Sequence, residues 1–200
     1  MRRRGAVLAA LAVTHALHST PHRLPPLAAT YLAVDEATTL PLGPARDEAA
    51  MAIALDEAKA AASRGEVPVG AVVVDDATGT ILSRAGNAVE ASHDATAHAE
   101  MLAMRAAAQS LQNWRLQDAT LYCTLEPCVV CLGAAYAFRV PRVVFGAPDH
   151  RLGAAGSWID LTEETHPFHA LDVRGGVCAE ESSKLLKDFF RERRKAGSRI

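Results

Sequence analysis

The sequence reads TAHAE at residues 96–100 and EPCVVC at residues 126–131. The first stretch places a histidine two positions before a glutamate, and the second places two cysteines three positions apart after a proline. Each stretch opens a segment with a helical pattern, and side chains three positions apart lie on one face of a helix. Free backbone amides and the dipole at a helix N-terminus favour thiolate over thiol. The two stretches therefore supply candidate metal ligands.

His98, Cys128 and Cys131 form a set of one nitrogen and two sulfur ligands, which suits Zn²⁺. Three protein ligands leave the fourth position of a tetrahedral ion open for water, as in catalytic sites. Such an ion lowers the pKa of that water to about 7. Glu100 is close enough to move the proton, a step that typically contributes about 10²- to 10⁴-fold in rate. H-x-E followed by P-C-x-x-C is typical of zinc deaminases, in which the glutamate is not a ligand.

Other interpretations of the cysteines remain open. A lone C-x-x-C is also typical of redox sites, and a histidine at a helix start is often only a cap or core residue. A structural zinc bound by all four cysteines would recruit Cys123 and Cys178, but it gives Glu100 no role. We expect Cys123 and Cys178 to be buried small apolar residues.

The segments around these motifs alternate between strand and helix patterns, which predicts a layered α/β fold. Expected helices are 47–63, 98–111, 127–138 (with Pro127 at the first position) and 180–195; expected strands are 67–76, 80–87, 119–125, 142–147 and 170–176. Residues 88–96 and 148–169 are expected to be loops.

The N-terminal segment, residues 1–44, differs from the rest. It opens with three arginines, contains no acidic residue before Asp35, and has an apolar run from Gly5 to Val13 that is too short to span a bilayer. We expect a targeting leader and a linker, with the domain in residues 45–200; a disordered tail is the alternative. The leader predicts an organelle, with a plastid preferred over a mitochondrion or the cytoplasm, and no membrane anchor.

The chain has 200 residues and a net charge of −2, which predicts one soluble globular domain rather than a polycation. Any nucleic-acid contact must therefore be local. The basic end of the last helix is the candidate surface, although cations there also complement the helix dipole. Its members are Arg191, Arg193, Arg194 and Lys195.

Five stretches, two of which contain the motifs above, carry a resemblance: GEVPVGAVVV, HDATAHAE, TLEPCVVCLGA, RVVFGAPDHRLGAAGS and LLKDFFRERR. With them, the chain from about Ala45 to Lys195 resembles the tRNA-specific adenosine deaminases of the bacterial and plastid type, in the cytidine deaminase-like superfamily. The resemblance implies a three-layer α/β/α fold with a mixed sheet of about five strands. It also implies one Zn²⁺ per subunit on the three ligands above, and a homodimer.

The resemblance further implies a reaction. The wobble adenosine, at the first anticodon position of tRNA, would be deaminated to inosine by water activated for attack at C6, with Glu100 as proton shuttle. Asn87 matches the asparagine that binds the target purine, although it could also be a strand-end turn residue, and the backbone amide near Ala99 would help to hold the purine.

One departure from the family pattern bears on how the substrate is recognised. Phe168-His169 stands where the family often has Asn-His, on the side expected to face RNA. The alternative function is a zinc deaminase of a free base or nucleoside, such as guanine, cytosine or adenosine. A partner subunit without activity is a third possibility, against which the presence of Glu100 argues.

Overall fold

A mixed five-stranded sheet forms the centre of the computed structural model, which describes residues 39–43, 45–163 and 166–197. The strand order is β2-β1-β3-β4-β5, and β1 pairs antiparallel with β2 and with β3. The pairs β3–β4 and β4–β5 are parallel, so the mixed five-stranded sheet is confirmed. The strands are β1 (Gly70–Asp75), β2 (Ile81–Gly86), β3 (Ala119–Leu125), β4 (Arg142–Ala147) and β5 (Asp172–Arg174).

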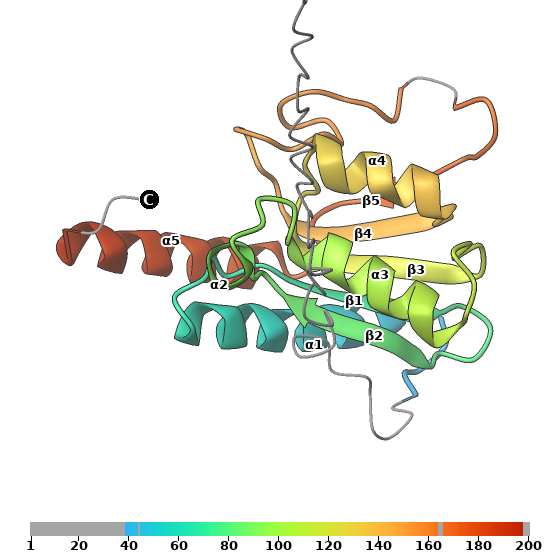
Figure 1. The fold of residues 1–200 in the computed structure, drawn as a ribbon, viewed down its shortest axis with the longest axis horizontal. Coiled ribbons are helices and arrows are strands. Elements are labelled where there is room, and N and C mark those ends of the chain that lie inside the picture. The colour runs from blue at the N-terminus through green and yellow to red at the C-terminus, as the bar shows by residue number, and fades with distance from the viewer. Residues whose placement is uncertain (1–38, 44, 164–165, 198–200) are drawn as a thin grey trace, which may run out of the picture.

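Helices cover both faces of this sheet and give three layers (Figure 1). On β1, Ala71 and Val73 belong to the core beneath α3 and α4, whereas Val72 and Val74 belong to the core beneath α1. This division follows from the period of two along a strand, and it confirms the α/β/α architecture. The helices are α1 (Ala45–Ser63), α2 (Val89–Ser92), α3 (Ala99–Ser110), α4 (Val129–Phe138) and α5 (Ala179–Lys195).

Small residues let α1 approach the sheet closely. Ala54 and Ala58 are fully buried, and a Cβ atom added at Gly70 would lie 2.6 Å from the backbone nitrogen of Ala58. Glycine is therefore required at the start of β1, because any side chain there would push α1 away from the sheet.

Hydrogen bonds and ion pairs of the buried Asp47 join α1 to three strands. Asp47 accepts hydrogen bonds from the Tyr122 hydroxyl at 3.0 Å, from Arg142 at 2.9 and 2.8 Å, and from Arg174 at 2.8 Å. The hydrogen bond from Arg142 is the main cause of the lowered pKa of Asp47. Burial and the neighbouring Asp47 raise the pKa of Tyr122 to about 12.

The structure corrects three local expectations. Helix α4 begins at Val129 with Cys128 as its N-cap, so Pro127 precedes the helix instead of occupying its first position. The short helix α2 lies in the segment expected to be a loop, because four residues are too few for a recognisable period. Strand β5 has three residues and is shorter than expected.

The N-terminal segment is described only from residue 39. Thr39 bridges Thr80, and the Leu40 N–H donates to the Gly79 carbonyl oxygen at 2.8 Å. The expected leader therefore lies almost entirely outside the described residues. None of the helices in the described part of the chain has an apolar stretch long enough to cross a lipid bilayer.

Candidate metal centre and substrate pocket

The site lies at one edge of the sheet, where strands that run in the same direction end. Because β2 and β3 are both antiparallel to β1, and β4 is parallel to β3, the carboxyl ends of β2, β3 and β4 meet at this edge. Asn87 follows β2 and Glu126 follows β3. Residues after adjacent strand ends are thereby brought to one place, although they are far apart in sequence.

Three candidate ligands converge from two helix starts. His98 is the N-cap of α3 and Cys128 is the N-cap of α4, while Cys131 lies in the first turn of α4. His98 Nδ1 is 3.6 Å from Cys128 Sγ and 3.4 Å from Cys131 Sγ. All three ligand atoms lie within 4.8 Å of one another. The expected proximity of these side chains is thus present in the fold.

The spacing of these atoms fits a tetrahedral zinc ion. Zinc–nitrogen bonds of about 2.0–2.1 Å and zinc–sulfur bonds of about 2.3 Å at a tetrahedral angle place nitrogen and sulfur about 3.6 Å apart. The two nitrogen–sulfur distances, 3.4 and 3.6 Å, agree with this value. The donor set therefore fits zinc, with Nδ1 as the ligand atom of His98.

Contacts among the three candidate ligands shift their pKa values in different directions. A hydrogen bond from Cys131 and a second from His98 lower the pKa of Cys128 to about 4. The hydrogen bond between the two thiols, and to a lesser extent burial, raises the pKa of Cys131. Its hydrogen bond to Cys128 raises the pKa of His98. Cys128 is therefore a thiolate at neutral pH, which is the form that binds a metal ion.

Glu100 lies beside this group without belonging to the set of ligand atoms. It is the second residue of α3 and is 4% exposed. Burial raises its pKa, so this carboxyl group holds a proton more readily than a solvated glutamate. A carboxyl group with a raised pKa at the wall of a pocket suits a role in which it both accepts and donates a proton.

A pocket of about 420 Å³ opens onto these residues. His98, Glu100 and Cys128 form part of its wall, and Asn87, which is 5% exposed, forms another part. Helix α5 and the loop after β4 complete it, which the sequence did not indicate. Their lining residues are Pro148, Asp149, Arg151, Leu152, Leu186 and Phe190.

Two buried carboxylates in the pocket wall, Glu66 and Glu126, were given no role by sequence reasoning. Glu126 accepts backbone N–H bonds from Asp149, Ala155 and Ser157, each at 3.0 Å. Burial raises the pKa of Glu126, but these hydrogen bonds, led by Ser157, lower it overall. Glu126 thereby holds the loop that follows β4. In the sequence, the position of Glu126 directly before Pro127 and Cys128 could have indicated a role in the site.

The remaining candidates occupy different surroundings. Ala99 is fully buried between His98 and Glu100 and is not among the lining residues of the pocket. Cys123 is fully buried in β3, as expected, whereas Cys178 is only partly buried and caps α5 with a φ of 53°. Within the described ranges, only the group His98, Cys128 and Cys131 is spaced to hold a metal ion.

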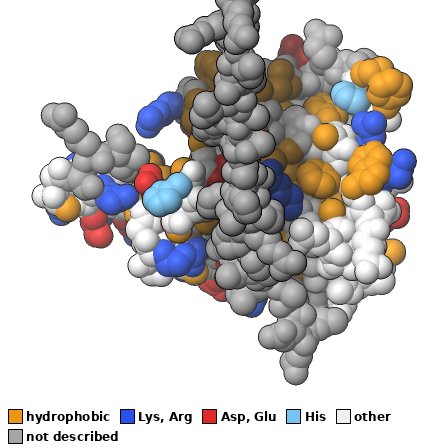
Figure 2. Space-filling model, in the orientation of Figure 1, with side chains coloured by type: hydrophobic (Ala, Val, Ile, Leu, Met, Phe, Trp, Pro, Cys, Tyr) orange, Lys and Arg blue, Asp and Glu red, His pale blue; other side chains and the backbone are white. Residues whose placement is uncertain are grey.

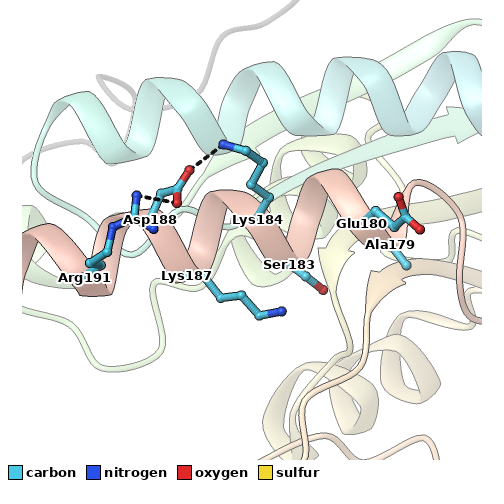
Figure 3. A pocket seen from close by; sticks show the side chains of 7 residues that line it. All are labelled: Ala179, Glu180, Ser183, Lys184, Lys187, Asp188 and Arg191. Carbon is cyan, nitrogen blue, oxygen red and sulfur yellow. Dashed lines mark hydrogen bonds and ion pairs between the residues drawn. The ribbon is translucent and has the colours of Figure 1, made fainter.

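The basic end of α5 is less uniform than expected. The Arg193 guanidinium donates to the Gly65 carbonyl oxygen at 3.0 Å and lies 5.3 Å from the Phe189 ring centroid. Arg194 and Lys195 are exposed. Figure 3 shows a pocket lined by residues of α5, where Asp188 lies between Lys184, at 2.6 Å, and Arg191, at 2.8 Å.

Apolar side chains are exposed at both ends of α4. Val129 and Val130, in the first turn of α4, are 40% and 51% exposed. Phe168 and His169 stand where the family often has Asn-His. Phe168 is 77% exposed, whereas His169 Nε2 lies 2.6 Å from the Val140 carbonyl oxygen. On the face seen in Figure 2, hydrophobic side chains gather on the upper right, where α4 and the loop between β4 and β5 lie in Figure 1.

Comparisons with known proteins agree with this geometry. The profile of the cytidine and deoxycytidylate deaminase zinc-binding region matches residues 44–147. The tRNA-specific adenosine deaminase of Haemophilus influenzae is 47% identical over 148 residues, which are 74% of this chain and 85% of that protein. The chloroplastic tRNA(adenine(34)) deaminase of Arabidopsis thaliana is 46% identical over 163 residues, covering 74% of this chain and 12% of that protein.

A solved structure extends the comparison to the fold. It comes from a study of A-to-I editing by tRNA:A34 deaminases at the wobble position of transfer RNA, and is 40% identical with a TM-score of 0.66. The match covers 69% of this chain and 99% of that chain. With the profile and the relatives, it shows that this chain belongs to the cytidine and deoxycytidylate deaminase family and, within it, to the tRNA-specific adenosine deaminases.

Proposed function

We propose that this protein deaminates the wobble adenosine of tRNA, at the first anticodon position, to inosine. The observation that carries the proposal is the arrangement of Glu100 beside a His-Cys-Cys group in the pocket. The similarity to tRNA-specific adenosine deaminases over about three quarters of the chain (74% for the Haemophilus protein) supports the choice of substrate. An anticodon loop is single-stranded, so the base leaves its stack at little cost.

In this proposal His98, Cys128 and Cys131 hold one Zn²⁺ per subunit. When bound, zinc lowers the pKa of a water ligand to about 7 and thereby supplies a nucleophile at neutral pH. The N-terminus of α4 favours the thiolate form of Cys128, which is the N-cap of that helix. Zinc content can be measured by atomic emission on the purified protein.

Glu100 moves the protons of the reaction. In the net reaction, a C–O bond forms at C6 of adenosine and the C6–N6 bond breaks. One proton of the water ends on N1 of inosine and the other on the departing ammonia. Glu100 delivers the first proton to N1 and carries the second to the leaving nitrogen. Its buried position, with a raised pKa, suits both steps.

The target base needs contacts that hold its edge. We assign one to the carboxamide of Asn87, which lines the pocket. A second is the backbone N–H of Ala99, because amides at a helix N-terminus point along the axis and stabilise developing negative charge. Together these groups would orient C6 toward the attacking oxygen.

Contacts with the rest of the tRNA are assigned to the end of α5. Arg194 and Lys195 are exposed on its last turn, close in sequence to Phe190, which lines the pocket. Arg191 and Arg193 also belong to this surface but have partners within the protein. Cations here would meet the phosphates of the anticodon stem-loop.

We also infer a homodimer and an organelle location. The exposed Val129 and Val130, next to a metal ligand, are the apolar side chains that a second copy would cover. The arginine-rich segment at residues 1–44 and the chloroplastic relative favour a plastid over a mitochondrion or the cytoplasm. Sedimentation and the location of a leader–fluorescent-protein fusion test these inferences separately.

The decisive experiment offers several substrates to the zinc-loaded protein. An anticodon stem-loop with adenosine at the wobble position is compared with the same loop carrying guanosine there, and with free guanine, adenosine and cytidine. Inosine formed only in the first loop supports the proposal. Turnover of free bases or nucleosides without turnover of the loop would replace it with the alternative function.

A further inference from the structure

Asn87 has a partner in the pocket wall that the proposed function leaves without a role. Its side-chain Nδ2 donates to Glu66 Oε2 at 3.2 Å. Glu66 is 1% exposed and Asn87 is 5% exposed. The backbone of Asn87 is fixed as well, because its N–H donates to the Val69 carbonyl oxygen at 2.9 Å. Asn87 is therefore held in place through both its side chain and its backbone.

Glu66 also caps the short helix α2. Its carboxylate accepts the backbone N–H of Ala91 at 2.8 Å and that of Glu90 at 3.3 Å. The N-cap of this helix is Ala88, which has no side-chain acceptor. The first-turn amides of a helix need an acceptor, and Glu66 supplies it from outside the helix. All three groups that meet the carboxylate are thus donors.

This arrangement fixes which end of the Asn87 carboxamide faces the pocket. An asparagine side chain has nearly the same shape in both flipped orientations, so its neighbours decide between them. A carboxylate only accepts hydrogen bonds. The NH₂ end must therefore face Glu66, and Oδ1 must be turned away from it. Among the residues that the structure describes, Asn87 Oδ1 has no hydrogen-bond partner, and it is available to a ligand.

We propose that Glu66 is a positioning residue that orients Asn87, so that the pocket presents a carbonyl oxygen, flanked by one N–H, to the target nucleoside. The proposal rests on the base-binding role of Asn87 under the proposed function. It assigns to Glu66 a part in substrate selection, because a flipped amide would exchange an acceptor for donors at the same place. A ligand edge that offers a donor beside an acceptor fits this arrangement.

The test moves the carboxylate from residue 66 to residue 87 and the amide from residue 87 to residue 66. Asn87→Asp places two carboxylates about as close as the native pair, and like charges at that distance oppose each other. Adding Glu66→Gln restores a hydrogen bond with its direction reversed, since the new amide donates to the new carboxylate. An oxygen still faces the pocket. We expect the double variant to exceed Asn87→Asp in kcat/KM by about tenfold or more, the effect of about one hydrogen bond to a charged group.

A matched control separates orientation from a general loss of charge. Glu57 is another carboxylate of low exposure, with a side chain 15% exposed, and it pairs with Arg84 of β2 at 3.2 Å. Glu57→Gln combined with Asn87→Asp should give no recovery. A double variant no better than Asn87→Asp alone, or an equal recovery with Glu57→Gln, would overturn the proposal. Zinc content and thermal unfolding of each variant show that it is loaded and folded.

A second measurement does not depend on turnover. In the zinc-loaded wild-type protein, the side-chain ¹⁵NH₂ protons of Asn87 should be shifted by the carboxylate, and Glu66→Gln should move them while Glu57→Gln does not. Equal resonances in all three proteins would contradict the contact. If the wild type deaminates a free base instead of the stem-loop, the tRNA proposal fails, but the exchange test still applies to that base.

Discussion

Glu126 and Gly153 are packed so closely that a Cβ atom on residue 153 would lie 2.5 Å from Glu126 Oε2. The loop after β4 therefore closes around a carboxylate that it also hydrogen-bonds, and it can do so only with glycine at this point. Because Asp149, whose N–H binds Glu126, lines the pocket, this contact connects loop packing to the shape of the site.

Gly153→Ala should accordingly displace the loop. We expect a loss of about 1–3 kcal/mol in the free energy of unfolding, as for overpacking in a filled interior, and a fall in kcat/KM with zinc content unchanged. Gly133→Ala in α4 is the control, because a Cβ there meets nothing within 4 Å and alanine favours a helix. Urea unfolding and activity assays of both variants test the contrast; equal behaviour would remove the role of Gly153.

Glu100→Gln should keep zinc and lose turnover. The amide cannot carry protons between the water and the base, which removes a contribution of about 10²- to 10⁴-fold. Because the three candidate ligands are untouched, the zinc content should equal that of the wild type. Single-turnover assays with the stem-loop provide the rate. Activity within a few-fold of the wild type would exclude Glu100 as the proton carrier.

The cysteines should divide into two classes. Cys131→Ser should lose most of the zinc, because a thiolate ligand is removed from a three-ligand site. Cys123→Ser and Cys178→Ser should leave the zinc content unchanged, since neither thiol belongs to the group that is spaced to hold a metal ion. Zinc lost from either of these two variants would support a four-cysteine structural site.

Asp47 should govern stability in acid. Its pKa is lowered in the folded state, first by the hydrogen bond from Arg142. A lowered folded pKa contributes stability that is present above the ordinary aspartate value, near 4, and is lost as the pH falls through the folded value. Asp47→Asn should cost about 2 kcal/mol at pH 7, with the difference from the wild type shrinking below pH 4. A constant difference would contradict this linkage.

Removal of the exposed cations of α5 should weaken tRNA binding and its dependence on salt. Truncation after Phe190 removes all four candidate cations, but it also removes the contact between Arg193 and Gly65. Arg194→Ala with Lys195→Ala is the cleaner variant. Each lost phosphate contact lowers the slope of log K against log salt by about 0.7–0.9. Lys59→Ala, at an exposed lysine of α1, is the control; an unchanged slope in the α5 variant would argue against the role.

The sequence indicated the candidate ligands His98, Cys128 and Cys131, which the fold brings together, because their spacing and chemistry act locally. Cys128 and Cys131 share the start of one helix, and His98 starts another, so residue type and helix pattern were sufficient. Glu66 and Glu126 could not be assigned in this way. Their partners are mostly backbone N–H groups, whose positions depend on how distant segments fold together.

Other differences have the same origin. Leu186 and Phe190 line the pocket only because α5 packs beside strands far from it in sequence. Arg193 was expected at a free basic surface, but its guanidinium contacts the carbonyl oxygen of Gly65, which is far from it in sequence. Helix α2 has four residues and depends on an external carboxylate, which no local pattern encodes.

The two helix starts that carry the ligands are separated along the chain by β3 and joined only when the sheet assembles. An extended polypeptide could offer the sulfur pair of Cys128 and Cys131, but not the imidazole at the same time. We therefore expect zinc to bind only after the sheet has formed, and to stabilise the folded state. At free zinc about a thousandfold above its dissociation constant, zinc binding would add about 4 kcal/mol to the free energy of unfolding, and chelators would remove that contribution.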